Sequence, residues 1–147
     1  MKLIAHKGNV NGPDPSTENT PEKIDWCIQN GYDVEIDIRY NPDTDKFYLG
    51  HDEPTHEVNW WWLAGRQDHL WIHCKDFRTL TEVVDNTSVY NYFWHQGDDY
   101  TVTSQNYVWA SPGKSYSSKT VIVEEDPLAL HDYDCYAICS DYVGRLK

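Results

Sequence analysis

Basic residues are scarce in this sequence. Lysine and arginine together number 12, against 24 aspartates and glutamates, so the formal net charge is −12 over 147 residues. Such a surface repels nucleic acids and anionic membranes, and we expect neither as a partner. Any phosphate that the protein binds must therefore be held by a local group of cations or by a metal ion.

Long apolar runs, export signals and paired cysteines are also missing. No run approaches the roughly 20 apolar residues that span a bilayer, and only Leu3, Ile4 and Ala5 precede the first histidine. The four cysteines, at positions 27, 74, 135 and 139, form no C-x-x-C pair. We therefore expect no signal peptide, no stable membrane insertion and reduced thiols in the cytoplasm, and we disfavour a cysteine-based zinc site.

Aromatic residues are abundant instead. They make up 14% of the chain and include seven Trp and eleven Tyr, which supply large apolar area for a core. No linker, low-complexity segment or repeat interrupts the chain, so we expect a single domain over residues 1–147. The run Trp60-Trp61-Trp62 favours core packing, with a lipid or sugar contact as the alternative.

Short apolar segments separated by turn or helix signals organise the chain. We expect strands at about 2–7, 33–39, 47–50, 69–74, 89–94, 100–103, 108–110, 120–124 and 136–139. Helices are expected at 17–30, with Pro21 in the first turn and Gly31 as C-cap, and at 79–86; the connection 56–67 could be helical. This strand count exceeds eight, which predicts that one of the middle segments is a loop.

The alternation of strands with short helices favours a parallel sheet. Segment 33–39 has one polar face, with Glu35, Asp37 and Arg39, whereas strands of a helix-covered open sheet are apolar on both faces. A barrel accommodates such a face, because it points into the lumen. Since an eight-fold barrel usually takes about 250 residues, we expect a compact (β/α)8 TIM-type barrel with several helices shortened or lost.

Groups that bind metal ions or phosphate gather where the apolar segments end. They are His6, Lys7, Glu35, Asp37, His51, His73 and Lys75. If these ends converge, they form one site for an anionic substrate and a divalent cation. The imidazoles suit acid–base work near neutral pH, and the lysines could neutralise phosphate.

Glu35 and Asp37 lie two apart on one strand, so their carboxylates point the same way. Like charges held this close are costly unless a cation bridges them, and oxygen ligands of this type suit Mg²⁺, Mn²⁺ or Ca²⁺. A salt bridge to Arg39 or a solvated sheet edge is the alternative.

The order of these motifs resembles that of a known family. The segments concerned are Ile4-Ala5-His6-Lys7-Gly8, Glu18-Asn19-Thr20, Val34-Glu35-Ile36-Asp37-Ile38-Arg39 and His51-Asp52. They resemble the H-R-G, E-N-T, E-x-D-x-R and H-D motifs of the glycerophosphodiester phosphodiesterase family, within the phospholipase-C-like phosphodiesterase superfamily and its TIM-type barrel. Segment 72–75 resembles the later I-E-x-K motif, and 138–142 resembles the closing strand.

The resemblance implies metal-dependent hydrolysis of a small phosphodiester, similar to a glycerophosphodiester, with a role for each matched residue. His6 and His51 would be the acid–base pair. Glu35 and Asp37 would bind the divalent metal. Glu18 would support the metal-side network or the histidines, and Lys75 would contact the phosphate.

Three features depart from the family pattern. Lys7 replaces an arginine, and a lysine cannot copy its two-pronged grip on phosphate. His73 stands where the family has a metal-binding carboxylate. As a ligand it would favour a metal that accepts nitrogen, such as Mn²⁺ or Zn²⁺; alternatively it only packs or donates a hydrogen bond. The short segment 53–68 replaces a long insertion that shapes the substrate pocket.

These departures leave an alternative function open, a catalytically weak or inactive binder of phosphorylated small molecules on the same barrel. A structural barrel with a remnant motif is a third possibility. His95 and Asp141 could border the site or be structural. The sequence does not determine the oligomeric state.

Overall fold

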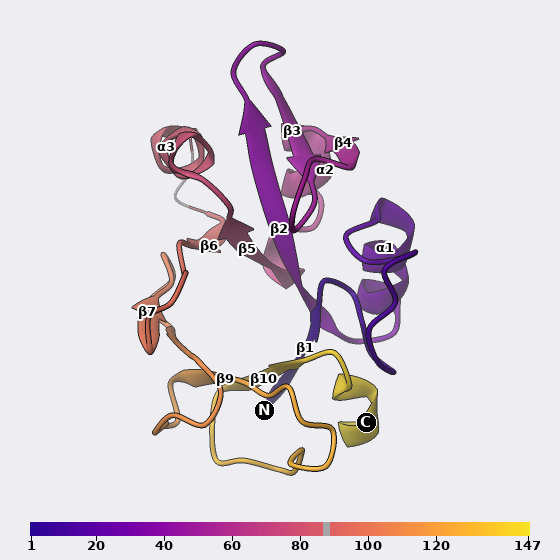
Figure 1. The fold of residues 1–147 in the computed structure, drawn as a ribbon, viewed down its shortest axis with the longest axis vertical. Helices are drawn as coiled ribbons and strands as arrows, with labels where there is room; N and C mark the ends of the chain where they lie inside the picture. The colour runs from indigo at the N-terminus through magenta and orange to yellow at the C-terminus, as the bar shows by residue number, and fades with distance from the viewer. Residues whose placement is uncertain (87–88) are drawn as a thin grey trace.

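A computed structural model describes residues 1–86 and 89–147 as a mixed α/β fold (Figure 1). Its strands are β1 (Lys2–His6), β2 (Asp33–Asn41), β3 (Lys46–Leu49), β4 (His56–Val58), β5 (Leu70–Cys74), β6 (Asn91–Phe93), β7 (Tyr100–Val102), β8 (Val108–Ala110), β9 (Thr120–Val123) and β10 (Ala137–Ser140). Its helices are α1 (Pro21–Gln29), α2 (Trp60–Ala64) and α3 (Phe77–Asn86), with 3-10 turns η1 (Gln67–His69) and η2 (Val143–Leu146). Within these ranges no helix is long and apolar enough to cross a membrane.

The strands form one mixed sheet of ten strands. The pairs β1–β2, β2–β5, β5–β6, β8–β9, β9–β10 and β10–β1 are parallel, whereas β3, β4 and β7 pair antiparallel with their neighbours. The sheet is therefore mixed: the parallel pairing expected from the sequence is found in six pairs, and these three strands depart from it. The expected middle loop is also wrong, because each predicted segment contains a strand and β4 adds another.

The parallel strands follow one another in chain order around a curve, with the three helices outside it (Figure 1). In the described residues no strand pairing joins β6 to β8, so the sheet is not closed. The rings of Phe93 on β6 and Trp109 on β8 nevertheless stack, with centroids 4.4 Å apart. The eight-stranded barrel stays a prediction.

Helix α1 begins at Pro21 because Thr20 caps it. The Thr20 hydroxyl accepts a hydrogen bond from the backbone N–H of Lys23, and Pro21 occupies the first turn. The helix ends at Gln29, and Gly31 follows with a φ of +86°, a conformation that glycine adopts without strain. Ile24 and Cys27 are buried, so the side of the helix that carries them faces the sheet.

Apolar side chains pack on both faces of the sheet. One cluster includes Val34, Ile36 and Ile38 of β2 and lies beneath the helices, together with Trp60 and Trp62, whereas Trp61 is 86% exposed. The second cluster lies on the concave face and consists of Ile4, Trp71, Phe93, Trp109, Val121, Ala137 and Cys139. Since side chains alternate along a strand, the residues two positions beyond Ile4 and Trp71, namely His6 and His73, share this concave face.

Candidate functional site

A cavity of about 310 Å³ lies at the carboxyl ends of the parallel strands. Six residues singled out from the sequence line it: His6, Glu35, Asp37, His51, His73 and His95, the last named as a possible border residue. Strand register explains the convergence, because His6 of β1 is level with Glu35 and His73 of β5 is level with Asp37. Its remaining lining comes from the second half of the chain: Gln96, Trp109, Ser111, Pro112, Val123 and Glu125.

The two carboxylates on β2 are almost inaccessible to water. Glu35 is 2% exposed and Asp37 1%. Both Glu35 oxygens and Asp37 Oδ1 are buried without a hydrogen-bond partner among the residues that the structure describes. Asn19 holds the rest of Asp37: its Nδ2 donates to Asp37 Oδ2 at 2.9 Å, and its Oδ1 accepts from the Asp37 backbone N–H at 3.0 Å. Buried carboxylate oxygens without hydrogen-bond donors are costly, and positive charge nearby lowers that cost.

His73 completes the cation-binding geometry. Its Nε2 lies 2.9 Å from the backbone carbonyl oxygen of His95, which can only accept, so Nε2 carries a hydrogen. Its Nδ1 then faces Asp37 Oδ1 at 3.4 Å, and two lone pairs so placed need a proton or a metal ion between them. A carbonyl behind the far nitrogen is the usual support of a metal-binding histidine.

One ligand atom each from Glu35, Asp37 and His73 lies within 4.8 Å of the others. Their ligand atoms, two carboxylate oxygens and an imidazole nitrogen, fit a divalent metal. Lys75, expected to contact phosphate, places its ammonium 3.7 Å from Asp37 Oδ1, on the border of this group.

The two acids titrate in opposite directions. Burial, followed by the negative charge of Asp37, raises the pKa of Glu35 to about 7. Burial also acts to raise the pKa of Asp37, but the contacts with His73 and Asn19 and the charge of Lys75 outweigh it, so that pKa lies below its ordinary value. Without a metal, Asp37 is therefore ionised while Glu35 takes up a proton as pH falls below about 7, and a bound cation would favour both charges.

His6 is held by an aspartate from the far end of the chain. Its Nδ1 lies 2.9 Å from Asp141 Oδ1, and its Nε2 lies 3.5 Å from Glu35 Oε2. Burial lowers the pKa of His6, but the hydrogen bond to Asp141 and the charge of Glu35 outweigh it and leave the pKa raised. Asp141 was predicted only as a possible border residue; its position after the last strand was the available signal.

Asn9 is a site residue that the sequence analysis missed. Its side-chain amide donates to Asp141 Oδ1 and to Glu18 Oε1, each at 2.9 Å. Glu18 therefore supports the His6 side of the site through Asn9 rather than contacting the acids on β2. Lys7 also lies on this side, with its Nζ 3.9 Å from Glu18 Oε2. Lys7, Glu18 and Lys75 are not among the residues that line the cavity.

His51 follows β3 and reaches the cavity from a loop. Its side chain is 46% exposed, and its Nδ1 lies 2.7 Å from Asp52 Oδ1. The hydrogen bond to His51 holds the pKa of the exposed Asp52 carboxyl below its ordinary value. Because the carboxylate accepts from Nδ1, the other ring nitrogen is the one available for proton transfer.

His95 lies at the edge of the site. Its carbonyl orients His73, its ring Nε2 is 3.3 Å from Ser111 Oγ, and it lines the cavity. Burial, followed by the charge of His73, lowers the pKa of the His95 imidazole. It serves here as support for His73.

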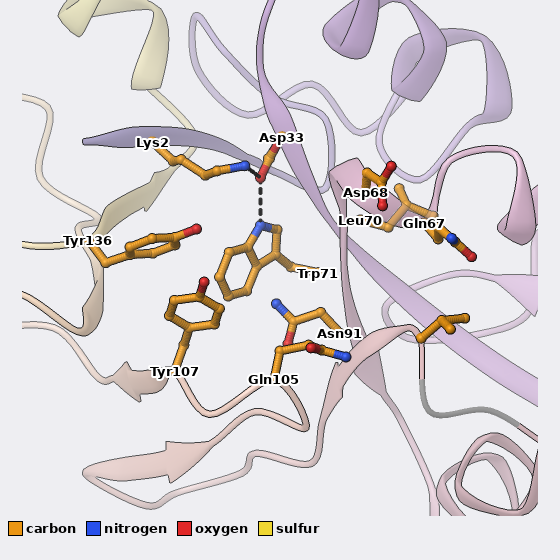
Figure 2. A pocket seen from close by; sticks show the side chains of 11 residues that line it. Lys2, Asp33, Gln67, Asp68, Leu70, Trp71, Asn91, Gln105, Tyr107 and Tyr136 are labelled. Atoms are coloured by element: carbon orange, nitrogen blue, oxygen red, sulfur yellow. Dashed lines mark hydrogen bonds and ion pairs between the residues drawn. The ribbon is translucent and has the colours of Figure 1, made fainter.

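A second pocket, of about 270 Å³, lies at the opposite, amino ends of the strands (Figure 2). Its buried acid, Asp33, already has partners: Oδ2 lies 3.2 Å from Lys2 Nζ and 3.0 Å from Trp71 Nε1. The stacked rings of Tyr107 and Tyr136 form another wall. Asp33 Oδ2 thus accepts two hydrogen bonds, whereas both Glu35 oxygens in the first cavity have no donor among the described residues.

Comparisons with protein-family models, curated proteins and solved structures give no match for this chain. Its function must therefore be argued from the cavity itself. The relevant facts are the unpartnered carboxylate oxygens, the orientation of His73 and the arrival of two further imidazoles at the same place.

Proposed function

We propose that this protein is a metal-dependent phosphodiester hydrolase that acts on a small, glycerophosphodiester-like substrate through the acid–base pair His6 and His51. The observation that carries the proposal is that both Glu35 oxygens and Asp37 Oδ1 are buried without a hydrogen-bond donor among the described residues, beside His73 Nδ1 and within one cavity that both histidines line. The resemblance of the motifs to the glycerophosphodiester phosphodiesterase family supports the same reaction.

Glu35, Asp37 and His73 would hold the cation. Among the metals considered, Mn²⁺ or Zn²⁺ suits a ligand set that includes an imidazole better than Mg²⁺ or Ca²⁺, which favour oxygen. When bound, the metal would neutralise the phosphoryl oxygens and polarise the scissile bond. Lys75, and Lys7 from the opposite side, would add positive charge for the phosphate.

The two histidines would divide the proton transfers. His51 Nε2, set by the bond of Nδ1 to Asp52, would take the proton from the attacking water or substrate hydroxyl. His6, whose pKa is raised by Asp141 and Glu35, would hold a proton and give it to the departing alcohol oxygen. We place this reaction in the cytoplasm, where the four free thiols stay reduced.

A weak or inactive binder of phosphorylated molecules is the second candidate. It is favoured by one observation: neither lysine lines the cavity, so the phosphate grip is less direct than the positions in the sequence suggest. Both candidates require the same metal, and only turnover separates them.

Metal binding is tested by thermal unfolding with Mn²⁺, Zn²⁺, Mg²⁺ or Ca²⁺. At a free cation concentration 100-fold above Kd, binding to the folded state stabilises it by about 2.7 kcal/mol, which raises the melting temperature. Asp37→Ala should abolish the shift, whereas Asp43→Ala, a change at an exposed acid, should keep it. Equal shifts in the two variants would contradict a metal site at Asp37.

Hydrolysis is tested with bis(p-nitrophenyl) phosphate in the presence of the metal that gives the largest shift. His51→Ala should lower turnover by roughly 100-fold or more while leaving the melting temperature and its metal shift in place. Near-normal turnover in His51→Ala would refute the acid–base scheme. A metal shift without turnover in the wild-type protein would favour the binder.

A further inference from the structure

Arg39 lies on β2 two residues beyond Asp37 and, by strand alternation, on the same face as the two acids. Its hydrogen bonds run elsewhere: Nε donates to the carbonyl oxygen of Gly50 at 3.0 Å, and Nη2 donates to the carbonyl oxygen of His51. No ion pair within residues 1–86 and 89–147 joins Arg39 to Glu35 or Asp37, so the salt bridge weighed from the sequence is not formed.

The segment that receives these bonds is a tight turn. Gly50 has a φ of +149°, and a Cβ at this position would lie 1.8 Å from the backbone oxygen of Glu53. The Gly50 N–H donates to the carbonyl of Asp37 at 3.1 Å, and the Thr55 N–H donates to that of Leu49 at 2.8 Å. The first residue of the turn, Gly50, is thereby hydrogen-bonded to β2. The bond from Arg39 to the carbonyl of His51 adds a contact with β2 one residue further along.

The ring of His51 has little packing to hold it. Its side chain is 46% exposed, and its partner Asp52 is 92% exposed, so that pair alone cannot fix the ring relative to the cavity. The backbone that carries the imidazole is itself held, because the His51 carbonyl oxygen accepts a hydrogen bond from Arg39.

We propose that Arg39 is the positioning residue for His51, a guanidinium fork that grips two successive carbonyls and holds the catalytic loop at a fixed distance from the metal ligands on β2. This rests on the proposed function, because it assumes that His51 transfers a proton. A planar guanidinium can donate to two carbonyls at once, whereas an ammonium offers a single point of attachment. Displacement of a catalytic group by about 1 Å can cost roughly 100-fold in rate.

The kinetic test uses Arg39→Ala, Arg39→Lys and the control Arg66→Ala, whose guanidinium pairs with Asp25 and the Trp62 carbonyl away from the cavity. With the metal bound, Arg39→Ala should lower kcat for bis(p-nitrophenyl) phosphate roughly 10- to 100-fold and change KM by less than about twofold. Arg39→Lys should recover only part of the loss, and guanidinium ions at millimolar concentration should partly restore Arg39→Ala. Arg66→Ala should keep wild-type kcat.

The double variant distinguishes positioning from general loss of structure. In a His51→Ala background, Arg39→Ala should cost less than about threefold in kcat, since the residue it positions is already gone. The same fold loss in both backgrounds would overturn the proposal.

A readout that does not depend on turnover keeps this inference separate from the proposed function. If the wild-type protein hydrolyses nothing, the proposed function fails, and NMR of the His51 ring nitrogens and of the backbone amides of residues 50–55 decides the role of Arg39. Shifted ring signals and faster amide exchange in Arg39→Ala, but not in Arg66→Ala, would support positioning. Unchanged signals in Arg39→Ala would overturn it.

Discussion

Lys7 has a positive backbone φ, a conformation that residues other than glycine, asparagine and aspartate rarely adopt. Its φ is +55°, and it directly precedes Gly8, whose φ is +89°. The Lys7 N–H donates to the carbonyl of Glu35, and the Lys7 carbonyl accepts from the Asn19 N–H, so the strained residue links the two motifs around the acids. Strain of this kind costs on the order of 1 kcal/mol and concentrates at functional sites.

A comparison of Lys7→Gly with Lys7→Ala measures this strain. Both variants lose the ammonium, but glycine relieves the positive φ whereas alanine keeps it. We expect Lys7→Gly to be more stable than Lys7→Ala by about 1 kcal/mol in urea unfolding, with hydrolysis reduced equally in both. If alanine is as stable as glycine, Lys7 is not strained in the folded protein.

At the scale of the element, α1 matters because of what precedes its first turn. Asn19, which bonds the Asp37 carboxylate and backbone, is the residue before the cap Thr20. The start of the helix therefore fixes the residue that orients the Asp37 carboxylate. Loss of the cap should lower the stability of the protein and leave the orientation of Asp37 unchanged, since Asn19 retains its own two hydrogen bonds to Asp37.

Thr20→Ala should lower the free energy of unfolding by about 1 kcal/mol, because the N–H of Lys23 loses its side-chain acceptor. Thr20→Ser, which keeps the hydroxyl, should lose less than half as much. Chemical denaturation of the metal-free proteins measures both. Equal losses in the two variants would mean that the methyl group, not the cap, supports α1.

The strands and the chemistry at their ends could be predicted from local sequence. Alternation placed Glu35 and Asp37 on one face of β2, and the turns around them placed His6, His51 and His73 near strand ends. The hydrogen bonds that support His6 could not be predicted, because they join distant residues: Asn9 and His6 bond to Asp141 across separations of 132 and 135 residues. Strand β4 was missed because its exposed residues, His56 and Glu57, give no apolar signal.

At the scale of the whole molecule, the sheet places two carboxylates on its concave face above a layer of aromatic and aliphatic side chains. Such surroundings are poor in water, so ionising both acids there without a cation costs free energy. The pKa of Glu35, raised to about 7 from an ordinary value of 4.5, reflects this cost in free energy. This raised pKa makes the free energy of unfolding depend on pH.

Metal-free protein should therefore lose stability as pH rises from about 5 to 7. A carboxyl with a raised folded pKa binds its proton more tightly when folded, so its contribution is most favourable below pH 4.5 and is lost as pH approaches 7. The full effect is roughly 3 kcal/mol. Asp37 affects the stability only at lower pH. Its pKa is lowered in the folded protein, so its contribution to stability is lost only as pH falls below about 3.8. The raised pKa of His6 adds a loss of the same sign above pH 6.5.

Urea unfolding in chelator at constant ionic strength tests this directly, with Glu35→Gln and Glu57→Gln as a matched pair. Glu35→Gln should show almost no fall between pH 5 and 6.5, whereas Glu57→Gln, which neutralises an exposed acid paired with Lys46, should follow the wild type. A saturating divalent metal should reverse the wild-type trend, because binding requires an ionised Glu35 and becomes tighter as pH rises. A wild-type protein whose stability is flat with pH would show that Glu35 is ionised without a cation, and the concave face would then need no metal to hold its two acids.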